Sequence, residues 1–439
     1  MNLGIAGLGV MGSNLALHAA DEKIATVVWN RTTERAVALA AQHPGIAAAP
    51  TMEDLVRLLP CPRPILLMVP AGAPVDELIA RLRPLLAPGD ILLDGGNSWF
   101  QDTRRRADAL LPSGVHFVGL GISGGEDGAR HGPALMPGGP RAAFDALRPM
   151  LEALAAKTSA GPCVGWLGPG GAGHFVKMAH NGIEYGVMQA IAEAWDLLRR
   201  GCGLDADACA DTFARWNKGP LDSFLMDLTA RILRVRDPET GRPLVDLVLD
   251  HAAQKGTGRW TVQAALELGV PVPTLAAALD ARLLSTFKDE RVRLAAAHPL
   301  PHPPPISVEE VHAALRATTI TAYLQGYRLI TAAAAAHGWG TDLAEVRRIW
   351  RGGCIIRAAL LDHGPRFEDL PHAGWRAGIA GIPTPAMSAA LAWYDALRTA
   401  DLPQNLTQAQ RDAFGAHTYV RRGREGEGAV HSEWGGEKG

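Results

Sequence analysis

The grouping of hydrophobic residues changes after residue 172. Before it, short apolar runs bounded by Gly, Pro or Asn occupy residues 2–6, 25–29, 65–69, 90–94 and 115–119. Stretches of helical length separate most of these runs, and this alternation is typical of buried parallel strands joined by crossover helices. The pattern predicts an α/β domain over residues 1–172, built on a doubly wound and mainly parallel sheet.

Beyond residue 172 the strand pattern gives way to helical periodicity. Amphipathic stretches rich in Ala and Leu cover residues 174–200, 205–216, 274–297, 307–336 and 341–362. We therefore expect a large all-α domain over residues 173–400. Within it, Tyr185 is followed by a long helix and then Trp216. Tyr327 is followed in the same way by a long helix and then Trp350, and this match fits either a tandem duplication or chance.

Two further segments are not expected to form helix or strand. Residues 298–305 contain five prolines, which lack the backbone N–H that a helix interior needs, so a stiff surface loop is predicted. After Pro403 the chain becomes polar and rich in glycine. The C-terminal tail, residues 401–439, should be disordered unless something docks it.

Composition is that of an ordinary globular protein. The 439 residues are 47% hydrophobic and 20% charged, and the net charge of −2 argues against a protein that binds nucleic acid or a membrane surface. No apolar stretch is long enough to span a membrane. The five cysteines are scattered without C-x-x-C spacing, and no apolar leader is visible, so a cytoplasmic location is the expectation. No cluster of residues has metal-ligand spacing, and we expect no metal.

The first candidate site follows the first strand, where Gly7, Gly9 and Gly12 form the pattern G-x-G-x-x-G. The first glycine permits a tight turn, the second lets the backbone approach a pyrophosphate, and the third lets helix and strand pack closely. The pattern alone is weak evidence. Its position between a strand and a helix strengthens it and predicts a Rossmann-type dinucleotide site.

The end of the second strand distinguishes NADP from NAD. NAD sites usually place a carboxylate there for the ribose 2′-hydroxyl, whereas this chain has Asn30, Arg31 and Thr32. A guanidinium pairs with a 2′-phosphate, which a carboxylate would repel. We therefore favour NADP, although Arg31 could also be a solvated surface residue.

The second candidate site is one face of a helix. Lys177, His180, Asn181, Glu184 and Tyr185 lie at positions i, i+3, i+4, i+7 and i+8. The face could simply be a solvated one with a Lys–Glu pair, but the flanking residues are apolar nearly all round and predict a buried helix. Burial would lower the pKa of the lysine and raise that of the glutamate, which suits a general base and a general acid.

Three polar, glycine-rich loops also contain candidate ligand-binding groups. They are residues 94–98, 123–128 and 255–261, and each offers backbone N–H groups or hydroxyls to an anion. Any one of them could instead be an ordinary loop. None has Walker spacing, so nucleotide hydrolysis is not indicated.

Taken together, the motifs resemble those of the decarboxylating 6-phosphogluconate dehydrogenases in their long form. The resemblance runs from Gly7 to Trp434 and includes residues 93–98, 122–126, 132–139, 177–186, 255–258, 353–357 and 410–419. It implies an NADP-dependent, metal-free oxidative decarboxylation of 6-phosphogluconate to ribulose 5-phosphate. By resemblance, Lys177 is the base at the C3 hydroxyl and Glu184 is the acid that completes tautomerisation.

The resemblance also implies the residues that bind each ligand. Substrate contacts are expected from Asn97, Ser123, Gly124, Gly125, His180, Asn181, Tyr185, Lys255, Thr257, Arg282, Arg411 and His417. Cofactor contacts are expected from Gly7, Leu8, Gly9, Val10, Met11, Gly12, Asn30, Arg31, Thr32, Val69, Pro70, Ala71 and Asn97. Arg411 and His417 are expected to come from the partner subunit of a homodimer, whose tails are exchanged.

The chain departs from the family pattern at two cofactor positions. Gly9 stands where alanine is usual, which should be tolerated, and Pro70 stands where a lysine is usual, which removes a cation beside the cofactor. Two other functions share parts of this pattern. A dehydrogenase of short 3-hydroxy acids would not need the phosphate-binding cations, and a non-catalytic NADP sensor would not need Lys177 and Glu184.

Overall fold

A computed structural model describes residues 1–253, 256–370 and 381–434 of the chain. The chain divides into two compact units, Met1–Ala390 and Leu391–Gly439, which are described separately. The boundary falls within helix α17 (Pro385–Leu397).

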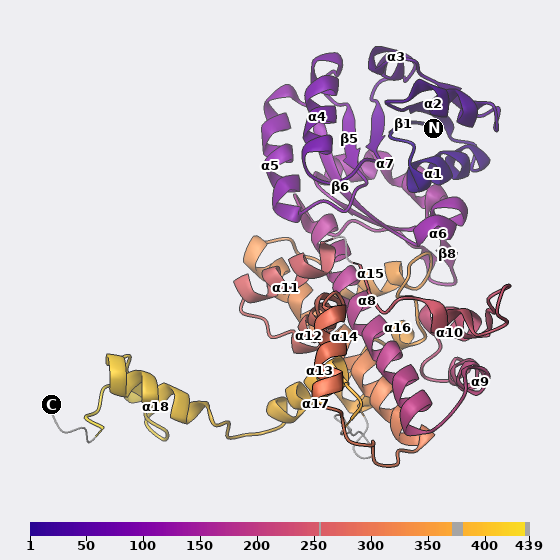
Figure 1. The fold of residues 1–439 in the computed structure, drawn as a ribbon. Helices are drawn as coiled ribbons and strands as arrows, with labels where there is room; N and C mark the ends of the chain where they lie inside the picture. The colour runs from indigo at the N-terminus through magenta and orange to yellow at the C-terminus, as the bar shows by residue number, and fades with distance from the viewer. Residues whose placement is uncertain (254–255, 371–380, 435–439) are drawn as a thin grey trace. The chain divides into compact units, whose positions relative to one another are not determined.

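The first unit begins with a seven-stranded sheet in the order β3-β2-β1-β4-β5-β6-β7 (Figure 1). Its strands are β1 (Asn2–Ala6), β2 (Ala25–Trp29), β3 (Ile46–Ala48), β4 (Pro64–Leu67), β5 (Ile91–Asp94), β6 (His116–Ser123) and β7 (Ala134–Gly138). The first six run parallel, which confirms the predicted doubly wound fold, and β7 pairs antiparallel with β6. The strand order reverses between β1 and β4, the place where such sheets bind ligands.

Helices cover both faces of this sheet. They are α1 (Val10–Asp21), α2 (Thr33–Ala40), α3 (Met52–Arg57), α4 (Ala73–Leu82), α5 (Phe100–Leu110), α6 (Gly125–His131) and α7 (Arg141–Leu154). One apolar cluster joins the strands to α1, α2 and α7, and a second joins them to α3, α4 and α5. Because the strands are covered on both faces, their sequences are continuous apolar runs rather than alternating ones.

After α7, β8 (Lys157–Thr158) and β9 (Gly161–Pro162) form a short antiparallel pair, and the described part of the first unit beyond residue 172 is helical, as predicted. The helices are α8 (Ala172–Asp196), α9 (Ala206–Trp216), α10 (Phe224–Arg234), α11 (Thr257–Glu267), α12 (Pro273–Ser285), α13 (Lys288–Ala297), α14 (Val308–His337), α15 (Leu343–Trp350) and α16 (Leu360–His363). The long helices α8 and α14 pack against each other, and α8 also packs against β6 and β7. No helix in the described ranges is long and apolar enough to cross a membrane.

Two of the expected helical stretches are interrupted. Residues 274–297 form α12 and α13 with a break at Thr286–Phe287, and residues 341–362 form α15 and α16 with a loop between them. The second break contains Gly352 and Gly353, and Gly353 has a φ of 62°, a left-handed conformation that ends a helix. The proline-rich segment 298–305 has no helix or strand, as predicted.

The second unit contains regular secondary structure, so the expectation of a disordered tail is wrong for the described part of residues 401–439. It contains α18 (Gln404–Gly415) and a short antiparallel pair, β10 (Tyr419–Val420) with β11 (Ala429–Val430). The physical reason is the fully buried carboxylate of Asp412, which accepts hydrogen bonds from Thr418 N (2.9 Å), His431 Nδ1 (2.9 Å), Ser432 N (3.0 Å) and Trp434 Nε1 (2.8 Å). Amino-acid composition cannot predict this structure, because it depends on one carboxylate that accepts hydrogen bonds from four separate groups.

Candidate active site

The glycine-rich loop between β1 and α1 is shaped for close approach of a ligand. Gly7 has a φ of 108°, and a Cβ there would lie 2.5 Å from Met68 O. A Cβ on Gly12 would collide with the Gly7 carbonyl, whereas one on Gly9 would meet nothing within 4 Å. The loop therefore needs glycine at its first and third positions, and the open space over Gly9 is where a pyrophosphate could approach. Alanine at Gly9 would also fit the protein itself.

The end of β2 is tied to this loop. Leu8 N donates to Asn30 Oδ1 (3.0 Å), and Asn30 Nδ2 donates to Thr32 O (3.0 Å). Arg31 lies between these contacts with an exposed side chain. Asn30 thus fixes the backbone on both sides of Arg31 while the guanidinium stays available to an anion. These residues fit the adenosine half of a phosphorylated dinucleotide.

The polar face of α8 packs closely against β6 at the Lys177 position. Gly121 in β6 has no side chain, and a Cβ there would lie 2.5 Å from Lys177 Cβ and 3.1 Å from Gly173 O. This close approach places Lys177 over the carboxyl end of β6. Its side chain is only 7% exposed.

The pKa values of Lys177 and Glu184 shift in opposite directions. Burial lowers the pKa of Lys177 below that of an ordinary lysine, and the negative charge of Glu184 offsets part of this. Burial also raises the pKa of Glu184, opposed by the charges of Lys177 and Arg282. The amine is therefore more easily deprotonated than usual and the carboxyl more easily protonated, as the sequence reading anticipated for a base and an acid.

His180 connects this face to the loop after β6. Its Nε2 lies 3.1 Å from Ser123 Oγ, and its Nδ1 lies 3.0 Å from Asn181 Oδ1. Because Asn181 Oδ1 can only accept, Nδ1–H donates to it and Nε2 accepts from Ser123. Burial and the charge of Lys177 hold the pKa of His180 well below its usual range, which keeps the ring neutral. Asn181 Nδ2 in turn donates to Thr257 Oγ1 (3.2 Å).

Tyr185 and Arg282 form the next part of the same face. The Arg282 guanidinium carbon lies 3.5 Å from the centre of the Tyr185 ring, a cation–π contact. Gly258 packs against the same ring, and a Cβ there would collide with Tyr185 Cε2. The start of α11, with Thr257, therefore lies beside Tyr185 and offers a hydroxyl near a cation.

The Ser123–Gly125 loop is held by the helical part of the unit. Gly124 has a φ of 122°, and a Cβ there would lie 2.6 Å from Gly353 O. The same carbonyl accepts a hydrogen bond from Ala134 N at 2.7 Å. Gly353, in the loop after α15, therefore fixes the backbone that follows Ser123.

The remaining predicted residues lie in loops, at the start of α1 or in the second unit. Asn97 is exposed in the loop after β5, and Val69, Pro70 and Ala71 form the loop after β4. Val10 and Met11 begin α1. Lys255 lies outside the described residues. Arg411 and His417 belong to the second unit, where both are exposed.

Several residues near the site were missed in the sequence reading. The Trp350 ring lies 5.5 Å from that of His180. Cys354 lies near enough to Lys177 to raise the pKa of the amine slightly against the effect of burial, and burial raises the pKa of the Cys354 thiol to about 12. Asp94 and Arg106 form a buried ion pair. Arg106 could have been noticed, because Phe100, Thr103, Arg106 and Leu110 mark the buried face of α5 at helical spacing, an unusual place for a cation.

Comparison with known families covers nearly the whole chain. Residues 2–168 match the family described as NAD binding domain of 6-phosphogluconate dehydrogenase. Residues 173–373 and 368–434 match 6-phosphogluconate dehydrogenase, C-terminal domain.

Individual relatives agree with the family match. A Synechococcus elongatus protein named 6-phosphogluconate dehydrogenase, decarboxylating, is 48% identical, and the alignment covers 98% of each chain. A Bacillus subtilis relative, named as NADP(+)-dependent and decarboxylating, is 44% identical over 98% of each chain. Among solved structures, Plasmodium falciparum 6-phosphogluconate dehydrogenase, described in apo form and with NADP+ or 6-phosphogluconate, has a TM-score of 0.92 at 36% identity and covers 99% of this chain and 100% of its own.

Proposed function

The chain belongs to the 6-phosphogluconate dehydrogenase family, and we infer that it catalyses the NADP-dependent oxidative decarboxylation of 6-phosphogluconate to ribulose 5-phosphate and CO2. The observation that carries the assignment of roles is the face of α8. There an amine with a lowered pKa and a carboxyl with a raised pKa are two helical turns apart on one face, where Lys177 is buried and the Glu184 side chain is 22% exposed.

We propose that NADP lies across the carboxyl ends of β1 and β4. Its nicotinamide supplies the hydride acceptor when bound. The N–H groups after Gly7 would hold the pyrophosphate, and Arg31 would pair with the 2′-phosphate. Val69, Pro70 and Ala71 would line the nicotinamide half, together with Asn97.

Lys177 would remove the proton from the C3 hydroxyl as hydride leaves C3. A neutral amine is required for this, and the lowered pKa of Lys177 increases the neutral fraction near neutral pH. The product is a β-keto acid, in which the C3 carbonyl can accept the electrons released as CO2 departs. Protonated Lys177 then stabilises the developing enolate oxygen.

Glu184 would complete the reaction by protonating the carbon that carried the carboxylate. Its raised pKa keeps a larger share of the carboxyl protonated than an exposed glutamate would have. The enediol thereby becomes the ketone. His180, held neutral by its surroundings, would position the substrate and leave proton transfer to its two neighbours on α8.

The other polar residues would bind the two ends of the substrate. Ser123, Gly124, Gly125, Asn97, His180 and Asn181 would surround the carboxylate end. Tyr185, Lys255, Thr257 and Arg282 would bind the phosphate. The contact of Arg282 with Tyr185 supports the phosphate set, because both residues belong to it. The hydrogen bond of Asn181 with Thr257 marks where the two sets meet.

We further propose a homodimer in which Arg411 and His417 of one subunit complete the pocket of the other. Both side chains are exposed within the second unit, on a segment that Asp412 holds in shape. A division into an NADP-binding domain (1–172), an all-helical domain (173–400) and a C-terminal tail (401–439) is part of the same proposal, as is a cytoplasmic location in keeping with the scattered cysteines.

An assay of NADPH formation at 340 nm tests the substrate assignment. We expect rapid turnover of 6-phosphogluconate with NADP, slower turnover with NAD, and a large loss with unphosphorylated gluconate. Equal rates with gluconate and 6-phosphogluconate would contradict a phosphosugar substrate and favour a short 3-hydroxy acid.

A further inference from the structure

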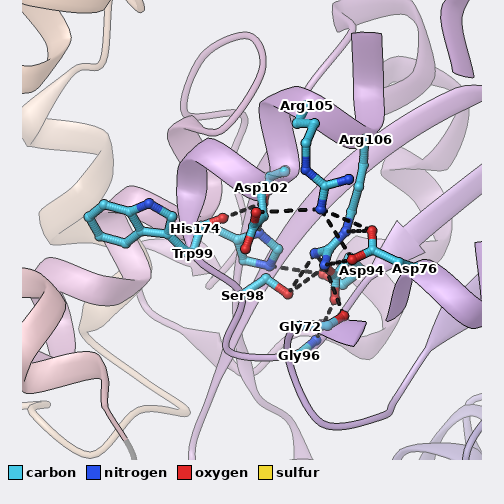
Figure 2. Close-up of polar contacts among 11 residues, drawn as sticks. Gly72, Asp76, Asp94, Gly96, Ser98, Trp99, Asp102, Arg105, Arg106 and His174 are labelled. Carbon is cyan, nitrogen blue, oxygen red and sulfur yellow. Dashed lines mark hydrogen bonds and ion pairs between the residues drawn. The ribbon is translucent and has the colours of Figure 1, made fainter. Parts of the chain in front are cut away.

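A buried ion pair joins β5 to α5 beside the two loops that contain predicted cofactor contacts. Asp94, the last residue of β5, has no exposed surface, and Arg106 of α5 is 2% exposed. Arg106 Nη1 lies 3.3 Å from Asp94 Oδ2 (Figure 2). Neither side chain is among the residues expected to touch a ligand.

Asp94 shapes the loop that follows it. Its Oδ1 accepts from Gly96 N (3.0 Å), and its Oδ2 accepts from Ser98 Oγ (2.6 Å). Asn97 lies between these two contacts. The carboxylate therefore fixes the turn that presents Asn97 to both predicted ligands.

Arg106 connects this turn to the loop after β4. Its Nη2 donates to Gly72 O (3.0 Å), and its Nε and Nη2 donate to the two oxygens of Asp76 at 2.8 and 3.1 Å. Gly72 has a φ of 91° and directly follows the predicted cofactor contacts Val69, Pro70 and Ala71. One guanidinium thus spans the two loops between which the nicotinamide and the substrate C3 would meet.

The same strand end also holds the helix that carries Lys177. The Asp94 carbonyl accepts from His174 Nε2 (3.0 Å), and His174 Nδ1 therefore accepts from Thr103 Oγ1 (2.6 Å). His174 is one turn before Lys177 on α8. Burial lowers the pKa of His174, which keeps the ring in the neutral form that this arrangement needs.

Stability alone does not explain such a pair. Taking two charges out of water offsets most of their attraction, and replacing a buried ion pair by apolar residues is often neutral or stabilising. A network that is fully hydrogen-bonded does, however, define one geometry, and catalysis is sensitive to displacements of about 1 Å.

Building on the proposed function, we propose that Arg106, with Asp94, is a positioning residue for hydride transfer. It sets the spacing between the loop after β4, the loop after β5 and the base on α8. It acts without touching substrate or cofactor.

The test substitutes Arg106→Lys, which retains a charge for Asp94 but cannot reach Gly72 and both oxygens of Asp76 together. The matched control is Arg105→Lys, because Arg105 also contacts Asp76 (3.0 Å) but from a side chain that is 56% exposed. The readouts are kcat, KM for each ligand, and the isotope effect with substrate deuterated at C3. We expect Arg106→Lys to lower kcat at least about tenfold, with KM values within about threefold and a larger isotope effect. Arg105→Lys should match the wild type.

A wild-type kcat and isotope effect in Arg106→Lys would overturn the proposal. So would a fall in kcat that accompanies loss of folded protein without a change in isotope effect. If Arg106→Lys does not fold, the pair Asp94→Asn with Arg106→Met removes both charges and is expected to fold with the same kinetic defect. Failure of the proposed function would be seen separately, as a wild-type enzyme inactive on 6-phosphogluconate.

Discussion

Substitution of Gly121 by alanine tests how the catalytic helix is seated on the sheet. The new methyl group would lie 2.5 Å from Lys177 Cβ, 3.1 Å from Gly173 O and 3.2 Å from Lys177 Cγ. Ordinary carbon contacts are about 3.5–4.0 Å, so α8 has to move away from β6 by roughly 1 Å. Overpacking of this kind costs about 1–3 kcal/mol of stability. Displacement of the base by about 1 Å lowers the rate on the order of 100-fold.

Thermal unfolding and steady-state kinetics at 340 nm measure the two effects. The control is Gly219→Ala, where an added Cβ has its nearest contact at 3.8 Å, to Trp216 O, and no positive φ is disturbed. The control should match the wild type in Tm and kcat. Wild-type Tm and kcat in Gly121→Ala would refute the close seating of Lys177 on β6.

Three further changes have defined outcomes. Glu184→Gln removes a charge that raises the pKa of Lys177, and it also removes the proposed acid. We therefore expect kcat to fall and the acid limb of the pH profile of kcat/KM to move to lower pH. An unmoved limb would argue against electrostatic coupling between Lys177 and Glu184. Arg31→Asp should raise KM for NADP roughly 10- to 100-fold and KM for NAD far less, whereas equal changes would remove Arg31 from the 2′-phosphate. Although burial opposes it, hydrogen bonds led by His431 and Trp434 hold the pKa of Asp412 below its usual range. The tail should therefore lose stability as pH falls below about 3.9, the pKa of an unfolded aspartate, and Asp412→Asn should unfold it at neutral pH. Trp434 fluorescence follows both, and an unchanged signal would contradict the role of Asp412.

Local patterns were sufficient for much of the fold and for the candidate catalytic pair. The glycine loop could be predicted because the positive φ of Gly7 and the close approach of Gly12 to the Gly7 carbonyl both arise within one strand–turn–helix unit. The polar face from Lys177 to Tyr185 could be predicted because helical geometry alone places these residues on one side of the helix. Five of the six parallel strands could be predicted because burial on both faces makes each a continuous apolar run, whereas the three-residue β3 has no such run.

Features that depend on residues far away in the sequence could not be predicted from local patterns. β7 contains Pro137 and Gly138 and is a strand because β6 pairs with it, and the break before α16 depends on Gly353 packing against Ala134 and Ala156. Arg106 meets Asp76, 30 residues away, and Gly72, 34 residues away, so its network is created by the sheet topology. The folded tail depends in the same way on Asp412 reaching Trp434.

The central claim is that the amine of Lys177 takes the C3 proton, and Lys177→Met tests it most directly. Methionine retains most of the buried stem, so the variant should fold and bind NADP with wild-type affinity in a fluorescence titration. We expect NADPH formation from 6-phosphogluconate to fall on the order of 10²- to 10⁴-fold, at every pH tested. A variant that binds NADP normally and still turns over within about tenfold of the wild type would contradict the account.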